Sequence, residues 1–203
     1  MPVITIARQY GSGGRRIGRA LAEKLELPYY DKELVALAAK KSGMSEEVFQ
    51  KADERHTSSL LYSLVMGNYS YAMPGTAANL PLNDQLFLLQ TQIIQEAARK
   101  GPCIIVGRCA DYILRDFPHV FKVYLYADRK LRVQRTIEEY GVDTQKAGDI
   151  VAKVDKRRAA YCNFYTGAKW GSPENYDLCL NTGSIGLDNA AQLILRASQM
   201  KLG

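Results

Sequence analysis

Residues 4–18 read Ile4-Thr5-Ile6-Ala7-Arg8-Gln9-Tyr10-Gly11-Ser12-Gly13-Gly14-Arg15-Arg16-Ile17-Gly18. The short run of β-branched and apolar residues at 3–7 predicts a buried strand, because such runs fit a sheet that is covered on both faces. Three glycines follow within four positions, and two arginines come directly after them. A loop of this kind exposes backbone N–H groups that can bind a phosphate.

The residues after the glycines predict a helix. Ile17, Leu21 and Leu25 recur every four positions, which is the spacing of one apolar helix face, and Pro28 ends the pattern at about residue 27. A strand, a glycine-rich loop and a helix therefore open the chain. The loop would lie at the positive end of the helix dipole, where a bound anion is stabilised.

Two known phosphate-binding motifs fit the loop only in part. The dinucleotide motif G-x-G-x-x-G, started at Gly11, places Arg16 at its third glycine, so a dinucleotide site is not expected. The motif G-x-x-x-x-G-K-[ST], with its last glycine on Gly13, puts Arg8 at the first glycine, Gly14 at the lysine and Arg15 at the hydroxyl position. We expect phosphate binding by the loop residues Gly11, Ser12, Gly13, Gly14, Arg15 and Arg16; a purely structural loop is the alternative.

Further strands and helices alternate along the chain. The pattern predicts strands at 103–106, 120–125 and 176–181, and helices from Asn83 or Asp84 to 100, near 110–115, over 129–140, from 144 to about 160 and from 187 to about 200. Helices are also expected from Asp31 to about 41 and from Ser45, each begun by a capping side chain. This alternation predicts parallel strands joined by helices, hence an α/β fold in three layers, α/β/α.

Composition and charge limit the classes of function. The chain has 203 residues, 47% of them hydrophobic, with 27 Lys and Arg against 21 Asp and Glu. This excess favours anionic partners. Basic residues group in separate clusters with no interleaved aromatic run, so nucleotides are expected as partners rather than nucleic acid. No long apolar stretch or leader-like start is seen, so no membrane association and a cytoplasmic protein are expected.

The cysteines and histidines give no metal-binding pattern. Four cysteines are scattered without a C-x-x-C pair, and the two histidines lie far from each other and from any cysteine in sequence. Metal sites usually show ligands in close pairs, so this pattern argues against zinc and against a disulfide framework. We expect inert thiols and no protein-held metal.

Five segments together resemble the cytidylate kinase-like family of P-loop proteins. They are the stretch Ile6 to Gly18, then Leu27-Pro28-Tyr29-Tyr30-Asp31-Lys32-Glu33-Leu34, Ile104-Ile105-Val106-Gly107-Arg108-Cys109-Ala110-Asp111-Tyr112-Ile113-Leu114, Val154-Asp155-Lys156-Arg157-Arg158-Ala159 and Tyr165-Thr166-Gly167-Ala168-Lys169-Trp170. The resemblance implies a nucleoside-monophosphate-kinase fold with a five-stranded parallel sheet. It also implies one P-loop kinase-like domain over 1–203, with a helical acceptor-binding insertion at about 31–82 and a lid-like region at about 129–170.

The resemblance also implies roles for particular residues. The loop would hold the phosphates of ATP, and Arg16, Arg132 and Arg135 would neutralise charge on the phosphoryl group in transfer. Arg108 follows a central strand and would bind the acceptor phosphate through two hydrogen bonds from its planar guanidinium. The other residues expected at the acceptor site are Asp31, Asp111, Asp155 and Arg158. Helix capping by Asp31, a local hydrogen bond to Asp111 and solvent exposure of Arg132 and Arg135 are the alternatives.

Position 14 has no lysine, position 15 has no hydroxyl group, and Val106 stands where cytidylate kinases carry an acidic residue. We expect Arg15 or Arg16 to replace the lysine, and Mg²⁺ to be held mainly by ATP and water.

The expected function is transfer of the ATP γ-phosphate to a small acceptor such as CMP or another nucleoside monophosphate. The alternatives are a catalytically weak or inactive nucleotide-binding regulatory protein of the same fold and, from charge alone, a nucleic-acid-binding module. The tyrosines and methionines within 68–81 suggest an acceptor-site element or a homodimer contact.

Overall fold

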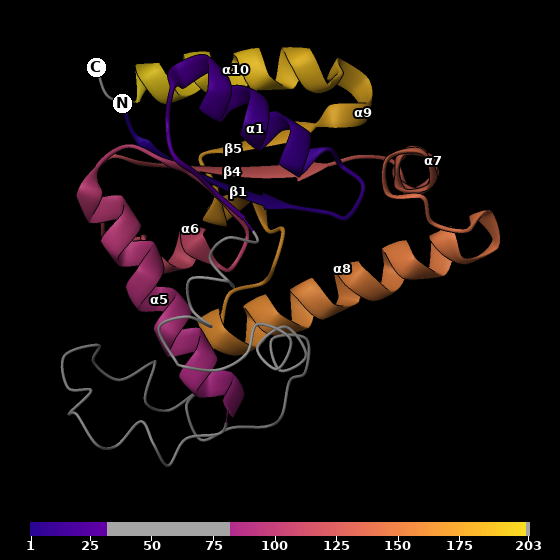
Figure 1. Ribbon diagram of the computed structural model, residues 1–203, viewed down its shortest axis with the longest axis horizontal. Coiled ribbons are helices and arrows are strands. Elements are labelled where there is room, and N and C mark those ends of the chain that lie inside the picture. Colours follow the sequence, from indigo (N-terminus) through magenta and orange to yellow (C-terminus); the bar gives the residue numbers. More distant parts are fainter. Residues whose placement is uncertain (32–81, 202–203) are drawn as a thin grey trace.

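The computed structural model describes residues 1–31 and 82–201. The predicted helices after Asp31 and Ser45, the residues 68–81 and most of the expected acceptor-binding insertion lie outside this part of the chain. In the remainder, a five-stranded sheet carries helices on both faces (Figure 1).

All strand pairs in the sheet are parallel, in the order β2-β3-β1-β4-β5. The strands are β1 (Val3–Arg8), β2 (Tyr29–Tyr30), β3 (Ile104–Val106), β4 (Val120–Tyr126) and β5 (Leu178–Asn181). β1 lies in the centre, so the glycine-rich loop leaves the middle of the sheet at its carboxyl edge. The fold class predicted from the sequence, an α/β/α sandwich with five parallel strands, is confirmed.

Helices α1 (Gly14–Leu25) and α10 (Leu187–Met200) cover one face, and α5 (Leu82–Lys100), α6 (Ala110–Ile113) and α8 (Thr144–Thr166) lie on the other (Figure 1). Helix α7 (Arg129–Tyr140) packs against α8 at one end of the sheet. A 3-10 turn (Pro173–Asn175) and the short α9 (Thr182–Ile185) flank β5. No helix in 1–31 or 82–201 is long and apolar enough to span a membrane.

Alternate residues of the central strands build two separate cores. Ile4 and Ile6 pack with Ile17 and Leu21 of α1, whereas Val3 packs with α5 and α6 on the opposite face. Neighbouring residues of a strand point to opposite faces, so a strand covered on both sides is apolar at nearly every position. This explains the unbroken hydrophobic run that opens the chain.

Several predicted boundaries were wrong. Strand β2 was not predicted, because two residues are too few to show the alternation or the apolar run that marks a strand. Helix α1 ends at Leu25, where Glu26 takes a left-handed conformation (φ 54°) and its N–H donates back to the last turn. Helix α8 continues to Thr166, well beyond 160, and β5 begins at Leu178 instead of 176.

The start of α5 also differs from the prediction. The helix begins at Leu82, so Asp84 lies in its first turn instead of capping it. The Asp84 carboxylate is buried and accepts a hydrogen bond of 3.0 Å from the Tyr165 hydroxyl. A carboxyl group that looked like a helix cap therefore joins α5 to α8.

Candidate functional site

The glycine-rich loop joins β1 to α1 and needs glycine at two positions. Gly11 (φ 74°) and Gly13 (φ 84°) both have left-handed backbones, which side chains other than glycine rarely adopt. A Cβ on Gly11 would lie 2.4 Å from the carbonyl oxygen of Arg132. Gly13 caps α1 without any side-chain hydrogen bond, so the N–H groups of the first turn remain available for an anion.

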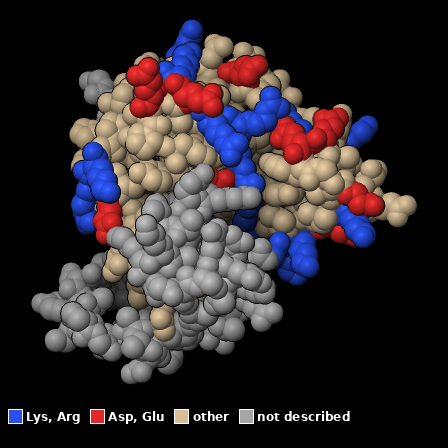
Figure 2. Space-filling view, in the orientation of Figure 1, with Lys and Arg blue, Asp and Glu red and all other residues tan. Residues whose placement is uncertain are grey.

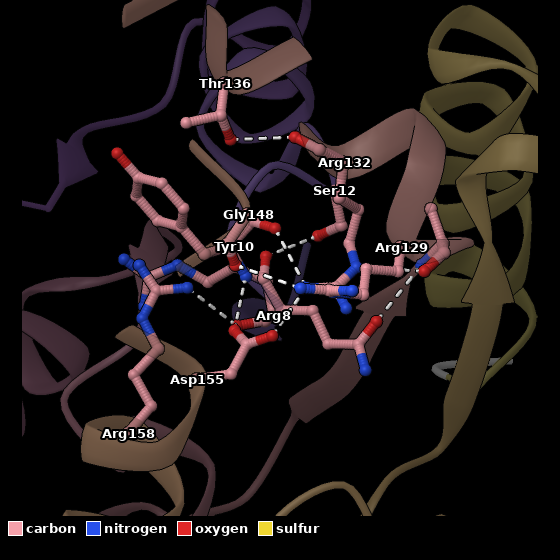
Figure 3. A network of polar contacts seen from close by, with 11 residues as sticks. Arg8, Tyr10, Ser12, Arg129, Arg132, Thr136, Gly148, Asp155 and Arg158 are labelled. Atoms are coloured by element: carbon pink, nitrogen blue, oxygen red, sulfur yellow. Dashed lines mark hydrogen bonds and ion pairs between the residues drawn. The ribbon is translucent and has the colours of Figure 1, made fainter. Parts of the chain in front are cut away.

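Asp155 of α8 holds the first half of this loop (Figure 3). Its Oδ1 accepts a hydrogen bond of 2.7 Å from the Tyr10 N–H, and its Oδ2 pairs with Nη1 of Arg132 at 2.5 Å. Arg132 also donates to the carbonyl oxygens of Tyr10 and Ala127, at 3.2 and 3.0 Å. These contacts connect α7 and α8 directly to the glycine-rich loop.

A second set of contacts holds the other half of the loop. The Ser12 side chain is fully buried and its hydroxyl donates to the Gln9 carbonyl oxygen at 2.8 Å, so this hydroxyl faces the protein. Thr182 of α9 donates to the Ser12 carbonyl oxygen at 2.8 Å and accepts from Nη1 of Arg135 at 3.0 Å. Arg135 thus positions the loop from outside through Thr182.

A cavity of about 240 Å³ opens beside the loop, at the carboxyl ends of β1 and β3. Ligands of open α/β sheets bind at this edge. Lys and Arg side chains gather in the middle of the face shown in Figure 2. The cavity is lined by Ala7, Arg8, Arg15, Asp31, Gly107, Arg108, Cys109, Asp111, Val154, Arg157, Arg158, Tyr161, Cys162 and Trp170.

Among the residues that the structure describes, five arginines and two acidic residues line this cavity, so it suits an anion. Burial lowers the pKa of Arg8, an effect opposed by Asp31 and reinforced by Arg15 and Arg108. Burial, followed by the charge of Arg8, lowers the pKa of Arg158 to about 9. Desolvated guanidinium groups that repel each other gain most from a ligand with several negative charges.

Asp31 partly balances this charge. Its carboxylate pairs with Nε of Arg15 at 2.6 Å and with Nη2 of Arg8 at 3.5 Å. Both guanidinium groups are therefore held at the cavity wall, next to the first turn of α1.

The β3–α6 connection carries backbone strain at the cavity. Gly107, Arg108 and Cys109 have φ angles of 79°, 60° and 52°, three successive residues in the left-handed region. Each non-glycine residue of this kind costs about 1 kcal/mol, and such strain concentrates at functional sites. Asp111, one turn further on, is buried, and this burial raises its pKa to about 6.

A second hollow lies directly on the loop and measures only about 10 Å³, room for about one water molecule. Its wall includes Gly11, Gly13 and Gly14 and the rings of Tyr10 and Tyr140, which stack with centroids 5.4 Å apart. Arg8, Arg15 and Arg158 line this hollow as well as the larger cavity. The two spaces are therefore adjacent parts of one site.

The structure brings most of the predicted site residues together. Gly11, Gly13, Gly14 and Arg15 line the small hollow, and Asp31, Arg108, Asp111 and Arg158 line the large cavity.

Five predicted site residues line neither space. Ser12, expected to bind phosphate, is buried and its hydroxyl donates to the Gln9 carbonyl oxygen. The loop is also held in place by Asp155 and Arg132, and by Arg135 through Thr182. Arg16 forms an ion pair with Glu139 at 3.0 Å, and its side chain is 62% exposed. Their predicted roles in acceptor binding and catalysis remain predictions.

Arg8, Tyr161 and Trp170 line the cavity but were not among the predicted site residues. The signal for Arg8 was its place at the first glycine of the phosphate-loop motif. Tyr161 and Trp170 come from the end of α8 and the segment after it, more than 140 residues beyond the loop, and only the fold brings them near.

Mg²⁺ has no ready set of protein ligands in the described ranges. They contain no group of three His, Cys, Asp or Glu side chains arranged to hold a metal ion. The Ser12 hydroxyl points inward, and position 15 is an arginine. The described residues therefore offer no metal site built from three such side chains.

Comparison with known proteins gives the family. A sequence model of the cytidylate kinase-like family matches residues 3–184. The chain is 27% identical to a cytidylate kinase from Archaeoglobus fulgidus over 204 residues, which cover 98% of this chain and 95% of that protein. Its structure resembles an uncharacterized protein from Eubacterium ventriosum with a TM-score of 0.73 and 27% identity, covering 98% and 99% of the two chains.

A more distant structural relative confirms the fold alone. A shikimate kinase from Acinetobacter baumannii, solved with shikimate, matches with a TM-score of 0.53 at 15% identity, over 99% of this chain and 94% of that one. The chain thus shares its overall fold with this kinase. With the match over residues 3–184, the chain belongs to the cytidylate kinase-like family.

Proposed function

We propose that the protein transfers the γ-phosphate of ATP to a small phosphorylated acceptor, with CMP or another nucleoside monophosphate as the expected class. One observation carries this proposal: a glycine-rich loop at a helix N-terminus opens directly into a cavity lined by five arginines. The family and the named relative, a cytidylate kinase, support the nucleotide as substrate.

We assign one substrate to each of the two spaces, with the hollow on the loop widening as the donor binds. The loop amides and Arg15 would hold the donor triphosphate, and Arg108 would hold the acceptor phosphate in the larger cavity. An acceptor oxygen then attacks the γ-phosphorus, the bond from this phosphorus to the β–γ bridging oxygen breaks, and ADP leaves. The protein contributes position and positive charge, which is the main catalytic need of phosphoryl transfer.

ATP brings Mg²⁺ with it in this proposal. The metal neutralises phosphate charge, and ATP and water would supply most of its ligands because the described residues offer no set of their own. The nearby guanidinium groups supply the remaining positive charge.

A nucleotide-binding protein with weak or no turnover is the second candidate, and one observation favours it. Arg16, Arg132 and Arg135, the predicted catalytic arginines, are each engaged by other protein groups. For either candidate, the hollow on the loop has room for only about one water molecule and has to widen before a triphosphate binds there.

A coupled ADP-release assay separates the two candidates. ATP, Mg²⁺ and one of CMP, dCMP, UMP, AMP or GMP are supplied, and ATP affinity is measured in parallel by calorimetry. Acceptor-dependent ADP release that falls in an Arg108→Ala variant supports the kinase. ATP binding with no release above the no-acceptor rate supports the binding protein. Absence of ATP binding refutes both.

A further inference from the structure

Position 14 is the place where the phosphate-loop motif carries its lysine, and here it is glycine. In that alignment Arg8 stands at the first glycine of the motif, a position that normally has no side chain. Relative to the motif, the chain lacks the lysine at position 14 and carries an arginine at position 8.

The structure connects them. A Cβ built on Gly14 would lie 2.8 Å from Cγ and 3.0 Å from Cβ of Arg8. Real Cβ atoms hardly ever approach another heavy atom so closely, and here the neighbours form the rigid base of the arginine side chain. The aliphatic part of Arg8 therefore occupies the space through which a side chain at position 14 would leave the helix. A lysine at 14 and an arginine at 8 exclude each other.

The guanidinium of Arg8 extends to the place where phosphate transfer would occur. It passes over Gly107, where a Cβ would clash directly with Nη1, so the β3–α6 connection leaves room for this group. Arg8 lines both the hollow on the loop and the larger cavity. Its side chain is 13% exposed, and its ion pair with Asp31 is long, at 3.5 Å.

The other two candidate cations are less well placed. Arg16 lines neither space and pairs with Glu139, with most of its side chain in solvent. Arg15 lines both spaces, but its Nε is held by Asp31 at 2.6 Å. The expectation that Arg15 or Arg16 replaces the lysine overlooked Arg8, because Arg8 precedes the glycines in sequence.

We propose that Arg8 is the phosphate-binding cation of this loop, filling the place of the missing lysine and contacting the polyphosphate of a nucleoside triphosphate between donor and acceptor sites. This proposal rests on the proposed function only in its choice of ligand. Asp31 holds the guanidinium in position until the polyanion arrives, and Arg15 then keeps the Asp31 carboxylate paired.

The test measures binding of ATP and of inorganic tripolyphosphate by calorimetry. Arg8→Met keeps the aliphatic part that packs on Gly14 and removes the charge, and it should weaken both ligands by about tenfold to a hundredfold, the range for a hydrogen bond to a charged group. Arg115→Met removes one arginine charge away from both spaces and should change binding by less than about twofold. Circular dichroism confirms that both variants are folded.

A pair of exchanges tests whether the two positions are equivalent. Arg8→Gly should bind as weakly as Arg8→Met. The double variant Arg8→Gly/Gly14→Lys restores the first glycine and the lysine of the motif, with Arg15 still at the hydroxyl position, and should recover at least about tenfold in tripolyphosphate affinity. A purely structural role for Arg8 would not be repaired by a lysine at another position.

Three results would overturn the proposal, and they are distinguishable. Wild-type affinity in Arg8→Met shows that Arg8 is not the cation and leaves the proposed function standing. A double variant as weak as Arg8→Gly shows that Arg8 does not take the lysine's place. A wild-type protein that binds neither ATP nor tripolyphosphate refutes the proposed function as well.

Discussion

Replacing Asp155 with alanine should destabilise the protein and release the glycine-rich loop from α8. Asp155 is 16% exposed and its partner Arg132 is 9% exposed, so the substitution leaves a nearly buried guanidinium without its counter-ion. It also leaves the Tyr10 N–H, now bonded at 2.7 Å, without its acceptor. Breaking a buried ion pair on one side costs about 3–5 kcal/mol. Some of that cost is recovered because Arg132 keeps its two carbonyl contacts.

We therefore expect a loss of about 3 kcal/mol in the free energy of unfolding, measured by urea denaturation followed by circular dichroism. For a chain of this length that loss lowers Tm by about 6–12 °C. Asp116→Ala is the matched control, since Asp116 also pairs with an arginine, Arg115, but at 3.4 Å with its side chain 84% exposed. Exposed pairs contribute about 0–1 kcal/mol.

The same contacts make a functional prediction that separates loop support from acceptor binding. Asp155→Asn keeps an oxygen that can accept from the Tyr10 N–H and removes the charge that pairs with Arg132. The substitution should therefore alter the position of the glycine-rich loop. If Asp155 supports the loop, KM for ATP rises more than KM for the acceptor. Equal stability of Asp155→Ala and Asp116→Ala, or a rise confined to the acceptor KM, would refute this reasoning.

Three further predictions follow from single contacts. Gly11→Ala should lose more than about 2 kcal/mol in the free energy of unfolding by urea denaturation, since its Cβ meets the Arg132 carbonyl oxygen; Gly141→Ala, with similar φ and open space, should lose only about 1 kcal/mol. Burial raises the pKa of Asp111 to about 6, so the folded state binds this proton more tightly than the unfolded chain. The free energy of unfolding should therefore be highest below about pH 4 and fall by up to about 3 kcal/mol as the pH rises through 6. In Asp111→Asn, urea denaturation at pH 4 to 7 should show a smaller fall in this free energy with pH. Arg108→Lys should raise the acceptor KM more than about tenfold and leave the ATP KM within about twofold in steady-state assays, because the planar fork is lost.

The amino-acid sequence alone determined the layered fold and the place of the glycine-rich loop. The strand at 3–8, the glycines and the helix after them are local signals, each fixed by side-chain period or backbone freedom within a few residues. Arg108 could be predicted for a similar reason, because it follows a buried strand directly and the carboxyl ends of parallel strands meet at one edge.

Only the tertiary structure decided which charged residues share the site. Asp155 contacts Tyr10 across 145 positions, so no local pattern could show that it braces the loop instead of lining the cavity. Arg8 lies three residues before the first of the glycines, yet the path of its side chain depends on the space above Gly14 and Gly107, which exists only once β1, α1 and β3 are packed together. The spacing of apolar residues determines which segments form strands and helices. The partner of a long charged side chain depends instead on which distant element the folded chain brings close to it.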